Sequence, residues 1–219
     1  MKKLLSYLFP ITLKKVNSEI NGKLEVNLIN GKKTLDTPTS NYSYGALQKV
    51  LHKGLSIIKF DSNVKKVLVL GLGAGSIVDT IRNDFKSAAY IELIENDPEV
   101  INIAKDEFGI NKFENINIIN ADAYDYVKTS SGKFEVIIVD IFIGNIIPQK
   151  FTTPEFIHDL ASILEPNGKI IYNSMRSTMK KENLDQIKSN FEQGDLMFTT
   201  HENIESTNNL LVIERKQAM

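Results

Sequence analysis

The chain has 219 residues, of which 42% are hydrophobic and 24% are charged, with a formal net charge of −1 and no cysteine. This composition is typical of a soluble globular protein with one domain, or with one domain and a small appendage. It excludes disulfides and thiolate metal sites, which suits a cytoplasmic protein, and the lack of basic excess argues against nucleic acid or an anionic membrane as a partner.

The first ten residues, MKKLLSYLFP, contain a short apolar run from Leu4 to Phe9 that Pro10 interrupts. A secretory signal needs roughly 7–15 apolar residues followed by a cleavage site of small residues. We therefore expect this segment to pack on the protein. No later stretch approaches the ~18 apolar residues of a membrane helix.

Residues 11–36 alternate apolar and polar side chains, and Asn21-Gly22 and Asn30-Gly31 separate the alternating runs. An Asn-Gly pair tolerates positive φ at both positions of a tight turn, which is the turn that joins antiparallel strands. The pattern predicts a small N-terminal β-hairpin module, which we assign to residues 1–41 as a first domain.

The stretch DTPTSN, residues 36–41, is typical of a linker. After it, apolar residues recur at helical spacing and predict a linking helix over residues 42–60. This helix opens the second domain, which we assign to residues 42–219.

Beyond the linking helix, short apolar runs alternate with helical patterns. We predict strands over residues 66–71, 88–95, 115–120, 134–140 and 169–174, helices over 76–85, 97–108, 123–129, 153–164 and 177–191, and a closing antiparallel strand pair over 195–201 and 209–215. This alternation predicts an α/β fold, with a mostly parallel, doubly wound sheet that helices cover on both faces. The antiparallel last strand makes it the Rossmann-like fold usual in class I S-adenosylmethionine-dependent methyltransferases. In such sheets the ligand lies at the carboxyl ends of the strands.

The first of these strands ends on Gly71, Gly73 and Gly75, with Ala74 between the last two. Glycine lets the backbone turn tightly and approach a ligand. The dinucleotide fingerprint G-x-G-x-x-G would place its last glycine at position 76, where Ser76 stands. The spacing G-x-G-x-G therefore favours a single nucleoside over a dinucleotide as the ligand. The alternative is a glycine-rich turn that binds no ligand.

The second strand ends in Glu95, whose carboxylate can accept hydrogen bonds from both hydroxyls of a ribose. NADP is disfavoured, because its 2′-phosphate would face a negative charge. The alternative is an acid that favours the start of the next helix, but Asp97 or Asn96 already serves that purpose. We take Asn96 with Glu95 as cofactor-binding.

The third strand leads into Asp122 and Ala123. The Asp122 carboxylate could accept from the exocyclic amine of adenine, and the Ala123 N–H could reach a ring nitrogen. Asp122 could also cap the helix that follows, and the two roles are compatible.

Asp140 ends the fourth buried strand, where a charge is costly unless it is used or paired. It could cap the following loop. In the other interpretation it faces the transferred group, positions an attacking amine and accepts its proton.

Four segments in this order, VLVLGLGAGS, IELIENDPEVINIAK, NADAYDYV and FEVIIVDIF, together resemble the spermidine synthase-like branch of the class I methyltransferase superfamily, over nearly the whole chain. The resemblance implies S-adenosylmethionine or its decarboxylated form as cofactor and a homodimer. It implies that Glu95 binds the ribose, that Asp122 binds adenine, and that Asp140 holds and deprotonates the attacking amine. Tyr44 matches a tyrosine that assists this aspartate.

The chain also departs from this family at acidic positions. Where spermidine synthases have an aspartate in the glycine loop, this chain has Ala74. Where they have a second acid after the catalytic aspartate, it has Ile143. Where a polar residue and a glutamate follow the tyrosine, it has Gly45 and Ala46. The loss of three carboxylates would weaken polyamine binding, and Ala74 would relieve repulsion against the carboxylate of intact S-adenosylmethionine.

Our leading hypothesis is therefore a transferase that uses S-adenosylmethionine to methylate a small acceptor, with the hairpin module and residues 141–152 covering the acceptor. The alternative is a polyamine aminopropyltransferase that uses decarboxylated S-adenosylmethionine. A third hypothesis is a non-catalytic nucleoside-binding scaffold, for which the apolar residues 141–143 and 146–147 would serve as a contact surface. The three histidines have no metal-ligand spacing, so we expect no metal site.

Overall fold

The computed structural model describes residues 2–37, 41–144, 146–175, 189, 196–206 and 208–216. The helix expected over residues 177–191 lies outside these residues, apart from Ser189.

A seven-stranded sheet forms the centre of the molecule, in the order β10-β11-β9-β8-β5-β6-β7. Its strands are β5 (Lys66–Leu70), β6 (Tyr90–Glu95), β7 (Ile116–Asn120), β8 (Phe134–Val139), β9 (Leu164–Met175), β10 (Leu196–Ile204) and β11 (Asn208–Arg215). Strands β5 to β9 pair in parallel, and β11 lies antiparallel between β9 and β10. The predicted fold, mostly parallel with an antiparallel last strand, is confirmed. Strand β9 starts earlier than expected, because Leu164 already pairs with Phe134.

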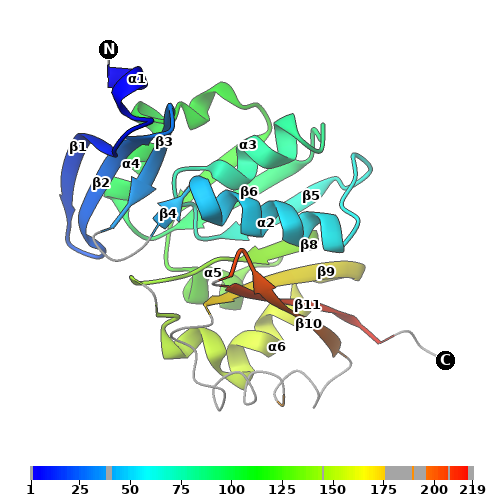
Figure 1. Ribbon diagram of the computed structural model, residues 1–219. Coiled ribbons are helices and arrows are strands. Elements are labelled where there is room, and N and C mark those ends of the chain that lie inside the picture. Colours follow the sequence, from blue (N-terminus) through cyan, green and yellow to red (C-terminus); the bar gives the residue numbers. More distant parts are fainter. Residues whose placement is uncertain are drawn as a thin grey trace.

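Helices cover both faces of this sheet (Figure 1). On one face lie α2 (Gly45–Ile57), α3 (Ser76–Asn83) and α4 (Pro98–Asp106), and on the other lie α5 (Ala123–Thr129) and α6 (Pro154–Ser162). Two short 3-10 helices are η1 (Ile110–Lys112) and η2 (Gln149–Thr152). Among the described residues, no helix is long and apolar enough to span a membrane.

The helix starts follow the chemistry expected of them. The Asp97 side chain accepts a hydrogen bond from the Glu99 N–H at the start of α4, and Thr153 accepts one from Phe156 N–H at the start of α6. A proline occupies the first turn of both helices, where its missing N–H has no partner to lose.

The N-terminal strands form a separate antiparallel sheet in the order β1-β2-β3-β4. Their bounds are β1 (Ile11–Ser18), β2 (Gly22–Ile29), β3 (Lys32–Asp36) and β4 (Asn41–Ser43), preceded by the short helix α1 (Lys2–Leu5). Asn30 and Gly31 have φ of 49° and 75° and make the predicted tight turn between β2 and β3. The N-terminal segment packs on this turn, since Asn30 N–H donates to the Ser6 carbonyl and Gly31 N–H to its hydroxyl.

The linking helix is shorter than the predicted range of residues 42–60. Residues 41–43 form β4, which pairs with β3, and Tyr44 has φ of 64°, a value that no residue of an α-helix adopts. Helix α2 therefore begins at Gly45. The division of the chain into domains at residue 41 stays a prediction.

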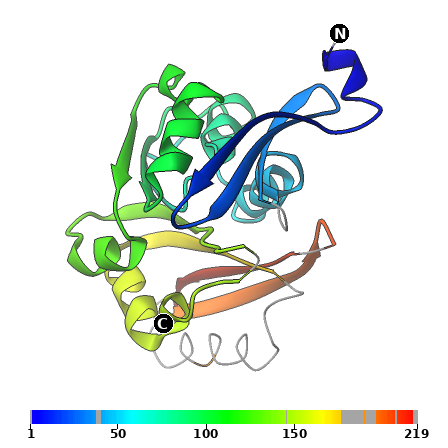
Figure 2. The same cartoon turned by 90° about the vertical axis from the view of Figure 1, so that its left-hand side faces the viewer.

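The N-terminal sheet lies beside α4 (Figure 2). An apolar cluster and a polar contact join it to the rest of the molecule. The apolar cluster comprises Leu24, Val26 and Leu35 from the N-terminal sheet, Ala74 from the glycine loop, and Val100 and Ile103 from α4. The polar contact is at Asp97, whose carboxylate accepts from the Ser18 hydroxyl and from Asn21 Nδ2, the latter at 2.6 Å. The tip of the β1–β2 hairpin is thereby held close to the end of β6.

Gly71, directly after β5, lies against the backbone of Asp140, directly after β8, and this contact generates a stability prediction. Gly71 has φ of 98°, and a Cβ built there would lie 2.2 Å from the Asp140 carbonyl oxygen. Gly71→Ala should therefore lower the free energy of unfolding, measured by urea denaturation, by at least about 2 kcal/mol more than a matched control.

The matched control is Gly109→Ala. Gly109 also has a left-handed φ, of 64°, but a Cβ there would meet nothing within 4 Å. Equal losses in the two variants would contradict a steric constraint at Gly71.

Candidate functional site

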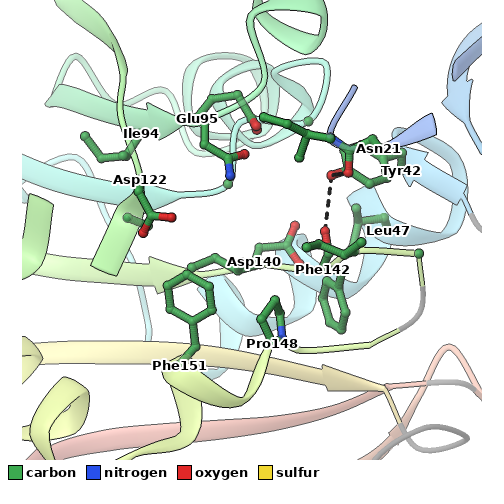
Figure 3. A pocket seen from close by; sticks show the side chains of 18 of the residues that line it. Asn21, Tyr42, Leu47, Ile94, Glu95, Asp122, Asp140, Phe142, Pro148 and Phe151 are labelled. Atoms are coloured by element: carbon green, nitrogen blue, oxygen red, sulfur yellow. Dashed lines mark hydrogen bonds between the residues drawn. The ribbon is translucent and has the colours of Figure 1, made fainter. Parts of the chain in front are cut away.

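A cavity of about 490 Å³ lies at the carboxyl ends of the parallel strands, where the N-terminal sheet meets the central sheet (Figure 3). The residues expected to bind a nucleoside or to act on it that line this cavity are Gly71, Gly73, Glu95, Asn96, Asp122, Ala123 and Asp140. Ala74, Gly75 and Tyr44 are not among its lining residues. The structure thus brings together the acids at three successive strand ends.

Gly71 and Gly73 expose bare backbone to the cavity. A Cβ at Gly73 would meet the Tyr42 carbonyl oxygen at 3.0 Å, and φ is 53° there. Gly75 has a different role: it is the left-handed residue before α3, and a Cβ on it would lie 2.6 Å from the Ile110 side chain. The glycines are therefore required by the packing of the loop, as well as by any ligand that approaches it.

Ala74 does not face the cavity as the departure from the family pattern suggested. Its side chain is fully buried in the apolar cluster between the glycine loop, the N-terminal sheet and α4. An aspartate at this position would place a charge among aliphatic side chains. The geometry therefore gives no support to the interpretation that Ala74 relieves repulsion against a cofactor carboxylate.

Glu95 is a buried carboxyl group at the cavity wall, with 6% of its surface exposed. One oxygen accepts from Leu72 N–H at 3.1 Å and the other from Asp97 N–H at 3.0 Å. Burial raises the pKa of Glu95 to about 7, and these backbone donors only partly offset the effect. Each of these oxygens accepts one backbone N–H hydrogen bond. The carboxylate can therefore accept further hydrogen bonds from the hydroxyls of a ligand.

Asp122 caps α5 by accepting from Tyr124 N–H at 2.8 Å, so its expected capping role is confirmed. Its other oxygen accepts a hydrogen bond from Lys150, whose ammonium also lies over the Phe151 ring. Partial burial opposes ionisation, but the Lys150 contact and the Tyr124 N–H together hold the pKa of Asp122 below its ordinary value. Sequence reasoning missed Lys150, because it follows β8 and reaches Asp122 only through the fold.

Asp140 lies in the cavity with Asp122 on one side and Leu47 on the other (Figure 3). Its Oδ1 accepts from Asn173 Nδ2 at 2.8 Å, and the Asn173 Oδ1 in turn accepts from Asn208 Nδ2 at 2.9 Å. Burial raises the pKa of Asp140 to about 6, against the opposing effect of the Asn173 hydrogen bond. These two asparagines, from β9 and β11, orient the carboxylate. No local motif marks them in the sequence.

The tyrosine that lines the cavity is Tyr42, two residues before the one expected. Its hydroxyl donates to Asn21 Oδ1 at 2.8 Å and lies 3.2 Å from the Phe142 carbonyl oxygen (Figure 3). The Tyr44 ring instead stacks on Phe108, with centroids 5.1 Å apart. The positive φ at Tyr44 turns its side chain toward the apolar cluster, so the geometry does not support the expected role of Tyr44 beside Asp140.

The model of the spermine/spermidine synthase domain matches residues 48–201, which is well over half of the chain. The chain belongs to the spermine/spermidine synthase family. The predicted resemblance is confirmed, and the segments that carried it, from the glycine loop to the loop after β8, lie within the matched range.

Relatives of two kinds are similar to this family member in sequence. A polyamine aminopropyltransferase from Vibrio vulnificus is 26% identical over 127 residues, which are 57% of this chain and 42% of that protein. An eEF1A lysine and N-terminal methyltransferase from Danio rerio is 28% identical over 160 residues, 65% of this chain and 23% of that protein. The chain thus spans less than half the length of either relative.

Solved structures show the same fold. Spermidine synthase from Thermotoga maritima superposes with a TM-score of 0.69 at 15% identity, over 94% of this chain and 73% of that one. Human methyltransferase-like protein 13 in complex with SAH gives 0.66 at 21% identity, over 78% and 82%.

The raised pKa of Glu95 in this member of the synthase family predicts a pH-dependent stability. The folded state binds the Glu95 proton more tightly than the unfolded state, whose ordinary pKa is 4.5. The resulting stabilisation is present below about pH 4.5 and is lost as the pH rises through about 7. The glutamine side chain of Glu95→Gln cannot ionise, so this variant should not lose that stabilisation. In the wild type the loss in the free energy of unfolding amounts to at most about 3 kcal/mol between pH 5 and pH 8.

The measurement is urea denaturation of wild type and variant at both pH values. Glu114→Gln, at an exposed position, serves as control and should leave the pH dependence unchanged. If wild type and Glu95→Gln lost the same stability on going to pH 8, the buried carboxyl would not be the cause.

Proposed function

We propose that this protein is a transferase that uses S-adenosylmethionine to methylate a small acceptor. The observation that carries the proposal is the position of Asp140, between Asp122 at one end of the cavity and the apolar side chains of Leu47 and Phe142 at the other (Figure 3). A nucleoside fits the first end, and an acceptor fits the second.

The residues at the nucleoside end fit such a cofactor. Gly71 and Gly73 would let it approach the backbone, and Glu95 would accept from the ribose hydroxyls. Asp122 and the Ala123 N–H would meet adenine, with Asn96 beside the ribose. When bound, S-adenosylmethionine supplies a methyl carbon activated by its sulfonium. Two related structures support this proposal. The human methyltransferase-like protein is in complex with SAH, and a spermidine synthase is in complex with the transition state analogue AdoDATO.

Asp140 would bind the acceptor and take the proton that its nucleophilic atom loses. Oδ1 is engaged by Asn173, so Oδ2 is the oxygen presented to the acceptor. The pKa of about 6 leaves the carboxylate ionised at neutral pH and still basic enough to accept a proton. Most of the acceleration would come from holding the acceptor in line with the methyl group.

The choice of methyl over aminopropyl transfer rests on two side chains. Ala46 and Ile143 both line the cavity, at positions where the family pattern would place carboxylates for a polyamine. The alternative, a polyamine aminopropyltransferase, is favoured by Asp140 and by the names of relatives such as the Vibrio protein. A non-catalytic scaffold is the third candidate, for which exposed Ile143 and Ile146 would form part of a contact surface.

Cofactor binding separates these proposals. By isothermal titration calorimetry, S-adenosylmethionine should bind more tightly than its decarboxylated form, and Glu95→Ala should weaken both by at least about tenfold through loss of the ribose contacts. Glu114→Ala, at an exposed position, is the control. Tighter binding of the decarboxylated form would favour aminopropyl transfer, and no binding of either would refute the cofactor assignment.

The role of Asp140 predicts a pH profile. Release of S-adenosylhomocysteine with a panel of amines should rise as the pH passes about 6, because the base must be ionised. Asp140→Asn should reduce this release by about 10²–10⁴-fold. Asn173→Leu removes a hydrogen bond that lowers the Asp140 pKa, so the rise should move to higher pH.

An unchanged rate in Asp140→Asn would show that Asp140 is not the base. A normal pH profile in Asn173→Leu would show that the asparagine does not tune it. Cofactor binding without any transfer across the panel would favour the scaffold.

A further inference from the structure

The far end of the cavity, beyond Asp140, is built by three segments that are distant in the sequence. They are the β1–β2 hairpin tip with Asn21, the start of α2 with Ala46 and Leu47, and the loop after β8 with Phe142 and Ile143. Figure 3 shows Leu47 and Phe142 on the side of Asp140 opposite to Asp122 and Ile94. We call this region the acceptor end.

Charge is scarce at the acceptor end. The charged side chains that line the cavity are Glu95, Asp122, Asp140 and Lys150. Asp122 and Lys150 pair with each other, and Glu95 accepts hydrogen bonds from the Leu72 and Asp97 N–H groups. Of the carboxylates that line the cavity in the described part of the chain, Asp140 is the one that lies beside Leu47 and Phe142 (Figure 3).

The neutral polar groups of this wall are already engaged within the protein. Asn21 donates from Nδ2 to Asp97 and accepts at Oδ1 from the Tyr42 hydroxyl. The Tyr42 hydroxyl is also within hydrogen-bond distance of the Phe142 carbonyl. A second ammonium group entering here would lose its water shell without gaining a counter-charge, whereas an apolar group would gain contacts with Leu47 and Ile143.

We propose that the acceptor is a monoamine with an apolar alkyl or aryl body, whose nitrogen meets Asp140 while the body fills the acceptor end. This inference rests on the proposed function for the identity of the neighbouring ligand. A monoamine differs from a polyamine in the number of positive charges that the cavity wall must neutralise. One carboxylate, that of Asp140, balances one ammonium group.

The test compares two probes of similar length, n-hexylamine and 1,4-diaminobutane, by calorimetric titration into the protein. Titrations are run with and without S-adenosylhomocysteine, whose own binding is measured first. Hexylamine should bind at least about tenfold more tightly than the diamine. Equal or tighter binding of the diamine, or no binding of hexylamine under either condition, would overturn the proposal.

A gain-of-function variant sharpens the comparison. Ala46→Glu adds a carboxylate at an exposed position on the cavity wall and should raise diaminobutane affinity at least about tenfold. Ile146→Glu is the matched control, because Ile146 is 63% exposed and does not line the cavity. An equal gain in both variants, or no gain in Ala46→Glu, would contradict the assignment of the acceptor end. Failure of S-adenosylhomocysteine to bind would count against the proposed function, whereas the amine titrations without it test the acceptor class separately.

Discussion

The buried carboxylate of Asp97 is the interaction on which the site depends. With 1% of its surface exposed, it accepts from the Ser18 hydroxyl, from Asn21 Nδ2 and from Glu99 N–H. A buried charge needs such partners, so the hairpin tip is held where it can supply them. That position places Asn21 against the Tyr42 hydroxyl and closes one wall of the cavity. The N-terminal sheet is therefore part of the site.

Two other carboxyl groups are held at a cost to stability. Burial raises the pKa of Glu95 to about 7 and that of Asp140 to about 6, so both ionised forms are disfavoured in the folded chain. Groups of this kind concentrate where a protein binds or transforms a ligand. Gly71 contributes to this arrangement, because a Cβ at this position would lie 2.2 Å from the carbonyl oxygen of Asp140.

Membership of the spermine/spermidine synthase family leaves the reaction open, since relatives carry the names of both aminopropyl and methyl transferases. The residues at the nucleoside end of the cavity would contact the adenosine part, which both cofactors share. The two reactions make different demands at the acceptor end, where a polyamine needs several carboxylates. Ala46 and Ile143 stand there in this chain. The acceptor end is therefore where the chemistry of this family member is decided.

The sequence by itself determined the features that depend on local pattern. Apolar runs, glycines and helix caps gave the order of strands and helices, and strand ends marked Glu95, Asp122 and Asp140, because the carboxyl ends of parallel strands share one edge of a sheet. The direction of the side chain at Tyr44, and the contacts of Lys150 and Asn173, were decided only by tertiary structure. The first depends on a single positive φ, and the others on pairing between segments far apart in the chain, for which no local periodicity exists.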